Sequence, residues 1–88
     1  MGLELRQMTI SIYSKRYQRF RKLLVDARKA KGLSQTALAE QLARVQAFVS
    51  KYERGERRLD VVEFLDVAAA LGVDPHEVIR QLTNGKQG

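Results

Sequence analysis

The chain contains 88 residues, of which 44% are apolar and 30% charged, and this length and composition are those of one small globular domain. It has no cysteine and a single histidine, His76, which excludes disulfides, thiolate metal sites and histidine clusters, so we expect no metal and no cofactor. The formal net charge of +6 is unevenly distributed, with +9 on residues 1–58 and −3 on residues 59–88, and this segregation favours a polyanionic partner such as nucleic acid.

Residues 1–12 carry a short apolar alternation that fits either a strand or an unstructured arm, and the pattern leaves both open. Glu4 and Arg6 stand where a signal peptide has an apolar run. No uncharged stretch approaches the roughly 18–20 residues of a membrane span. We therefore expect neither export nor membrane attachment, and a cytoplasmic location.

A helical pattern begins at Ser14 and ends at Gly32. Most basic side chains of this segment fall away from its apolar line, so we expect them in solvent. The apolar line recurs at spacings of three and four residues and consists of Tyr13, Tyr17, Phe20, Leu24 and Ala27.

Two short helices follow, and residues 43–45 form a tight turn between them. Ser34 is a favourable N-cap for the first, which is about two turns long. The second runs over residues 46–54 and is stopped by Gly55. The apolar residues of the pair that face inward are Leu38, Ala39, Leu42, Val49 and Tyr52.

Asp60 and Glu63 form a capping-box pattern that predicts the start of a fourth helix, which Gly72 ends. Asp74 and Pro75 suit the cap and first position of a fifth helix. The sequence therefore predicts an all-α fold, a compact five-helix bundle over residues 13–82, with residues 83–88 as a frayed tail. The expected core residues of the fourth helix are Val61, Leu65, Ala68 and Ala69, and the fifth helix carries Val78, Ile79 and Leu82.

Residues 34–55, SQTALAEQLARVQAFVSKYERG, fit a helix-turn-helix, in which a small residue, here Ala39, lies where the helices cross and the exposed second helix fits the major groove of DNA. Over residues 13–82 the chain resembles the Cro/C1-type (XRE-like) helix-turn-helix regulators of bacteria and phages, through ARKAKGLSQTALAEQL, VSKYERGERR and LDVVEFLDVAAALGVDP. The resemblance implies a phage-repressor-like fold and double-stranded DNA as partner.

The resemblance also implies roles for individual residues. Gln35 would bind backbone phosphate and brace Gln46, and Arg28 would form a structural ion pair with Glu53. Base reading is supported by chemistry, because a glutamine amide pairs with adenine, lysine reaches guanine, and an alanine can contact a thymine methyl. The implied groove-facing positions are Gln46, Ala47, Ser50 and Lys51. Sequence-independent attraction to phosphate is expected from the flanking arginines, Arg44, Arg54, Arg57 and Arg58.

The turn departs from the family pattern at three positions. Ala43 stands where many members have glycine, and a positive φ there would cost about 1 kcal/mol. Arg44 and Val45 replace an apolar residue and a Ser/Thr cap, so the second helix of the motif lacks a side-chain cap, and Arg44 is expected to reach a phosphate or a base edge. Phe48 either stacks on DNA or packs beside Tyr52, and packing is the favoured interpretation.

These features predict a sequence-specific DNA-binding transcription regulator, a repressor that blocks a promoter. We do not expect an enzyme, because the sequence offers no catalytic constellation. One short recognition helix contacts few base pairs, so we expect a homodimer on an inverted-repeat operator. The interface is assigned to Val78, Ile79 and Leu82, with residues 3–12 as a second candidate. The alternative is a protein-interaction module of antitoxin or anti-activator type that binds a regulatory protein partner.

Overall fold

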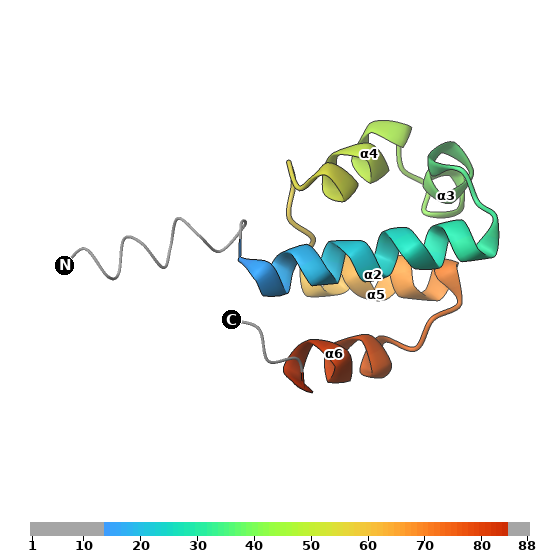
Figure 1. Cartoon of the computed structure of the whole chain (residues 1–88). Coiled ribbons are helices and arrows are strands. Elements are labelled where there is room, and N and C mark those ends of the chain that lie inside the picture. Colours follow the sequence, from blue (N-terminus) through green and yellow to red (C-terminus); the bar gives the residue numbers. More distant parts are fainter. Residues whose placement is uncertain (1–13, 85–88) are drawn as a thin grey trace.

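The computed structural model describes residues 14–84, and this part of the chain contains five helices (Figure 1). The all-α, five-helix fold predicted from the sequence is confirmed, and the last helix continues two residues beyond position 82. The predictions for residues 1–13, which include Tyr13 in the apolar line of the first helix, and for residues 85–88 lie outside the described residues. The helices are α2 (Lys15–Lys31), α3 (Gln35–Gln41), α4 (Gln46–Arg54), α5 (Val61–Leu71) and α6 (Pro75–Asn84).

Local side-chain chemistry sets where the helices begin and end. The Oγ atoms of Ser14 and Ser34 each accept a hydrogen bond, at 3.0 Å, from the backbone N–H three residues on, which satisfies a donor that a helix start leaves unpaired. The capping box predicted for α5 is confirmed, since the Glu63 N–H donates to Asp60 Oδ1 at 2.7 Å and the Asp60 N–H donates to Glu63 Oε1 at 3.0 Å. Three helices end at glycines in the left-handed conformation, namely Gly32, Gly55 and Gly72.

α2 and α5 run through the centre of the fold, with α3 and α4 on one side and α6 on the other (Figure 1). α2 contacts α4, α5 and α6, while α3 packs mainly on α4. The arrangement presents α3 and α4 together, away from α6. All five helices contribute to one core, which consists of Leu24, Leu38, Ala39, Phe48, Val49, Tyr52, Phe64, Val67, Ala68, Leu71 and Val78.

The predicted buried face of α5 is wrong. Val61, Leu65 and Ala69 are predicted inside, but Val61 and Leu65 are 73% and 46% exposed and Ala69 is exposed as well. The helix carries two apolar stripes, and the one that contains Phe64 packs inward, where the ring meets Phe20 edge to face with centroids 5.3 Å apart. The buried stripe, spaced i, i+3, i+4 and i+7, consists of Phe64, Val67, Ala68 and Leu71, of which only Ala68 is predicted correctly.

The three α6 residues assigned to a dimer interface occupy different environments. Val78 lies in the core and is 7% exposed, and Leu82 packs against the core. Ile79 is 49% exposed. Val78 is therefore already covered within the protomer, and Ile79 offers the most side-chain surface of the three to a partner.

Candidate nucleic-acid interface

The turn between α3 and α4 is entered without a glycine. Ala43 has a φ of 57°, in the left-handed region that costs a non-glycine residue about 1 kcal/mol. The Arg44 N–H donates to the Ala39 carbonyl at 2.9 Å and so closes the end of α3. Val45 precedes α4 in an extended conformation and gives it no side-chain cap, as predicted. α4 therefore begins without the stabilisation that a serine cap gives α3.

The side chains of α4 divide between the core and an outer face. Gln46, Ala47, Lys51 and Arg54 are exposed. Ser50, predicted to face the groove with the first three, is 9% exposed, and its Oγ accepts a hydrogen bond from Arg54 Nη1 at 2.6 Å. The structure therefore brings Gln46, Ala47 and Lys51 onto the exposed face of α4 and leaves Ser50 largely covered.

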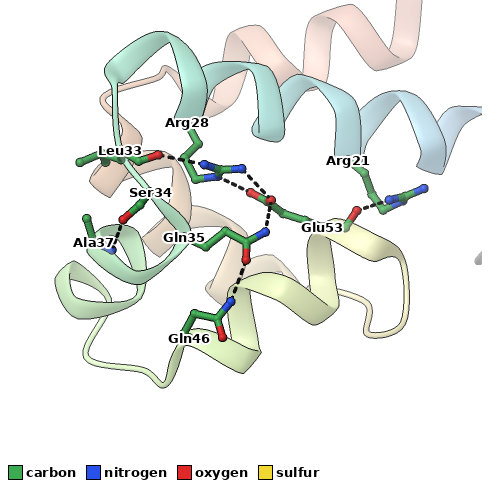
Figure 2. Close-up of polar contacts among 8 residues, drawn as sticks. All are labelled: Arg21, Arg28, Leu33, Ser34, Gln35, Ala37, Gln46 and Glu53. Atoms are coloured by element: carbon green, nitrogen blue, oxygen red, sulfur yellow. Dashed lines mark hydrogen bonds and ion pairs between the residues drawn. The ribbon is translucent and has the colours of Figure 1, made fainter.

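A chain of polar contacts runs from α2 through the end of α4 and α3 to the first residue of α4 (Figure 2). Arg28 donates to Glu53 Oε2 through Nε at 2.7 Å and to Oε1 through Nη2 at 3.0 Å. Gln35 Nε2 also donates to Glu53 Oε1, at 2.8 Å, and Gln35 Oε1 accepts from Gln46 Nε2 at 2.7 Å. The amide of Gln46 is thus held from behind by a residue of α3.

The Arg28–Glu53 pair is buried, and its neighbours complete its hydrogen bonding. Arg28 Nη1 donates to the Leu33 carbonyl at 2.9 Å, and Arg21 donates to the backbone carbonyl of Glu53 (Figure 2). The hydrogen bonds to Glu53 hold the pKa of the Arg28 guanidinium above its usual value, although burial alone would lower it. Two arginines of α2 therefore fix the C-terminal end of α4.

A second group of side chains joins both flanks of α4 to α5. We call this group the Glu63 cluster, and it consists of Arg44, Phe48, Arg57 and Glu63. Arg57 donates to Glu63 twice, from Nη1 to Oε1 at 2.9 Å and from Nη2 to Oε2 at 2.8 Å. Arg44 Nη1 lies 3.7 Å from Glu63 Oε2. The guanidinium carbons of Arg44 and Arg57 lie 3.9 and 5.0 Å from the centre of the Phe48 ring. The arginines that flank α4 thus share one ring and one carboxylate.

The Glu63 carboxylate is held in its charged form. The hydrogen bonds from Arg57 lower its pKa to about 2, with further contributions from the backbone N–H of Asp60 and the charge of Arg44. The same contact raises the pKa of the Arg57 guanidinium. The cluster therefore keeps its ion pair through the whole neutral range of pH.

Phe48 is 6% exposed and packs edge to face on Tyr52, with ring centroids 5.5 Å apart. The packing interpretation of Phe48 is therefore confirmed. Its ring also supports the two guanidiniums of the Glu63 cluster, a role that its position in the sequence does not reveal.

The remaining arginines assigned to phosphate gather at the end of α4. Arg54 donates from Nε to Glu56 Oε2 at 2.9 Å, in addition to its bond with Ser50. The guanidinium carbon of Arg58 lies 5.7 Å from the centre of the Tyr17 ring. Arg54, Arg57 and Arg58 therefore all lie at the C-terminal end of α4 or in the loop that follows.

The sequence does not identify the Glu63 cluster. Glu63 stands out only as the third residue of a capping box, and Arg44 and Arg57 stand out only as cations. The contacts join residues 6 and 19 positions apart across a turn and a loop, so no helical spacing relates them. The only available signal is an acidic residue close to several arginines, which predicts no particular partner.

Neither a metal site nor a membrane span is found between residues 14 and 84. No three His, Cys, Asp or Glu side chains gather there in a way that could hold a metal ion. No helix in the same range combines the length and the apolar character needed to cross a bilayer.

Comparison with known proteins agrees with this geometry. A helix-turn-helix family model, HTH_3, matches residues 24–78, which include α3, α4 and α5. The solved structure of an XRE-family like protein from Pseudomonas syringae pv. tomato str. DC3000 is 46% identical, with a TM-score of 0.78 over 86% of this chain and 93% of that one. The restriction-modification controller protein C.AhdI from Aeromonas hydrophila is 39% identical, with a TM-score of 0.62 over 67% of this chain and 86% of that one.

No significant match was found among curated proteins. The family model nevertheless covers more than half of the chain, and the Pseudomonas protein is similar over most of both chains. The chain belongs to the XRE-like (Cro/C1-type) helix-turn-helix family of DNA-binding transcription regulators.

Proposed function

We propose that this chain is a transcriptional repressor that reads a specific sequence in the major groove of double-stranded DNA with α4. The observation that carries the proposal is the exposed face of α4, where Gln35 holds Gln46 at 2.7 Å and Ala47 and Lys51 are exposed nearby. An amide held in one orientation loses less conformational freedom on binding than a mobile one. This supports direct reading of base edges by α4.

Gln46 keeps the groups that it needs to read adenine. A glutamine amide has two N–H donors and a carbonyl acceptor, and the bond to Gln35 uses one donor. The second N–H and the carbonyl oxygen suit N7 and N6 of adenine. Lys51 suits guanine O6 or N7, and Ala47 suits a thymine methyl. We assign Arg44, which precedes α4, to a base edge or a phosphate beside this face.

We assign sequence-independent attraction to Arg54, Arg57 and Arg58, and a phosphate contact to Gln35. Cations placed near phosphate release condensed counterions, which gives affinity that depends strongly on salt. The net charge of +9 on residues 1–58 supports this assignment. Because Ser50 is largely covered and bonded to Arg54, we propose that it orients Arg54 and does not contact bases itself.

We propose that the working unit on DNA is a homodimer bound to an inverted repeat. A recognition helix of nine residues contacts few base pairs, and two copies related by a two-fold axis would read half-sites about one helical turn, roughly 34 Å, apart. Ile79 and the exposed part of Leu82 are the interface candidates on α6, since Val78 is covered in the core. Residues 59–88 carry a net charge of −3 and so lack the positive charge that would repel a second copy. Residues 3–12 are the second candidate.

Selection of binding sites from random double-stranded DNA, followed by gel shifts of the selected sequence, tests this function. We expect an inverted-repeat motif, and log affinity that falls linearly with log salt by a slope near −0.9 for each phosphate contacted. Gln46→Ala should weaken binding by about 1–3 kcal/mol and relax the preference at one or two base pairs. Gln81→Ala, which removes an exposed glutamine of α6, should leave the motif unchanged. An unchanged motif with Gln46→Ala would show that the register assigned to α4 is wrong.

The exposed apolar side chains of Val61, Val62 and Leu65 on α5 support a second candidate function, a protein-interaction module of antitoxin or anti-activator type. Such a module would select no DNA motif under the conditions above. The similarity to C.AhdI, which is described as a controller protein, favours the DNA-binding regulator. A reporter promoter that carries the selected motif would then distinguish repression from activation.

A further inference from the structure

The Glu63 cluster connects the proposed DNA-contacting surface to α5 through the carboxylate of Glu63. Arg44 immediately precedes the cap residue of α4, and Arg57 follows α4 by three residues. Both guanidiniums lie against the buried Phe48 ring, and both reach Glu63. The Glu63 side chain is only 15% exposed, whereas those of Arg44 and Arg57 are about 40% exposed, at 41% and 39%. The acid is therefore enclosed, and the two cations face solvent beside α4.

The bonds within the cluster leave part of each guanidinium available. An arginine has five N–H donors. Arg57 uses Nη1 for Glu63 and for the Arg58 carbonyl, at 2.9 and 3.0 Å, and Nη2 for Glu63 at 2.8 Å. Nε and the second N–H of Nη2 have no partner among residues 14–84. A two-pronged contact also fixes the plane of the guanidinium, so the direction of these remaining donors is fixed as well.

We propose that Glu63 is a positioning residue for DNA binding, which holds Arg57 and Arg44 against Phe48 so that their remaining N–H groups meet the DNA backbone in a fixed arrangement. The inference rests on the proposed function, and it adds a residue of α5 that lies outside the helix-turn-helix. Ordering a mobile side chain at an interface costs enough free energy to change affinity roughly two- to tenfold for each side chain. In this protein the two arginines are already ordered in the unbound, folded chain, so DNA binding would not incur this cost for them.

A neutralising role for Glu63 would change the affinity for DNA in the opposite direction. A carboxylate beside two arginines could simply neutralise them and repel phosphate, and its removal would then strengthen binding. A freed Arg57 would make a new phosphate contact, and the salt slope would become more negative by about 0.9. The sign of the change in affinity therefore separates positioning from neutralisation.

Glu63→Gln is the variant that tests this role, because a glutamine at this position preserves the capping box while it removes the ion pair. Asp60→Asn is the matched control. It removes one negative charge from the same helix start, keeps a favourable N-cap residue, and leaves the contacts of Arg57 with Glu63 intact. Affinity for the selected DNA should be measured as a function of salt, with thermal melts to show that each variant is folded at the assay temperature.

We expect Glu63→Gln to weaken binding roughly fivefold without a steeper salt slope, and Asp60→Asn to bind as tightly as the wild type or more tightly. In an Arg57→Gln background the loss caused by Glu63→Gln should shrink. If Glu63→Gln is not folded, Glu63→Asp, which keeps the charge and shortens its reach, should show the same weakening. If the wild type selects a motif and Glu63→Gln binds as tightly as Asp60→Asn, the positioning role is refuted and the proposed function stands. A wild-type chain that selects no DNA overturns both.

Discussion

Replacement of Glu53 by glutamine should destabilise the whole domain, although it changes only one non-hydrogen atom of the side chain. Glu53 accepts three side-chain hydrogen bonds, two from Arg28 and one from Gln35. A glutamine offers one carbonyl oxygen, and its NH₂ group would face donors of Arg28 or Gln35. The side chains of Arg28 and Glu53 are 11% and 6% exposed, so water cannot readily replace the lost acceptor. The variant would therefore bury the charge of Arg28 without its partner.

The expected loss in the free energy of unfolding follows from the burial of this charge. Removal of one partner from a buried ion pair costs about 3–5 kcal/mol, mostly because the remaining charge is uncompensated. The total stability of a small domain is about 5–15 kcal/mol, so this loss is a large share of it. For a chain of this size the melting temperature should fall by roughly 12–40 °C. The Gln35 amide would also lose an acceptor, so the bracing of Gln46 should loosen in the folded fraction.

Chemical denaturation at pH 7 of the wild type, Glu53→Gln and a matched control provides the measurement. The control is Asp26→Asn, which breaks the Lys22–Asp26 pair. The charged atoms of that pair lie 2.8 Å apart, close to the 2.7 Å of the buried pair, but its side chains are 76% and 58% exposed. That change should cost no more than about 0.5 kcal/mol. The double variant Arg28→Met with Glu53→Met should recover much of the loss, since no buried charge remains. A cost for Glu53→Gln as small as that of Asp26→Asn would refute the reasoning.

Three further predictions address the turn, the acid response and the assembly. Ala43→Gly should stabilise the domain by about 1 kcal/mol because it removes the strain of a φ of 57°, whereas Ala69→Gly within α5 should destabilise it by a similar amount in the same denaturation assay. The folded-state pKa of Glu63 is lowered from 4.5 to about 2. The ionised carboxylate therefore stabilises the fold above pH 4.5, and this stabilisation is lost as the pH falls towards 2. The difference in melting temperature between the wild type and Glu63→Gln should shrink over that range. If the chain forms the proposed homodimer, Ile79→Asp should dissociate it in sedimentation experiments, and an intact dimer would assign the interface elsewhere.

The sequence predicts helix limits well here because they depend on neighbouring residues. Ser34 caps the first helix of the motif, and the Asp60–Glu63 box starts α5, through bonds that span only three residues. Gly55 stops α4 for an equally local reason, since it adopts a left-handed conformation that other residues avoid. Helix limits of this kind can therefore be predicted without knowledge of the tertiary fold.

The buried face of α5 could not be predicted in the same way. Apolar residues lie on two sides of this helix, so periodicity alone gives two solutions. The choice depends on Phe20 of α2, whose ring meets Phe64. Ser50 shows the same limit, because its burial depends on how deeply α4 sits against its neighbours. Which of these side chains is buried is therefore determined by packing between helices.

α4 depends strongly on that packing. It has nine residues, begins without a side-chain cap and follows a strained alanine, and isolated helices of that length are marginal in water. Its position is fixed instead by contacts on its inner side: Gln35 holds its first residue, and Arg28 holds Glu53 near its last. Those contacts leave the outer side to Gln46, Ala47 and Lys51. The reading of bases that we propose for these three residues would therefore depend on residues of α2 and α3 that need not touch a base.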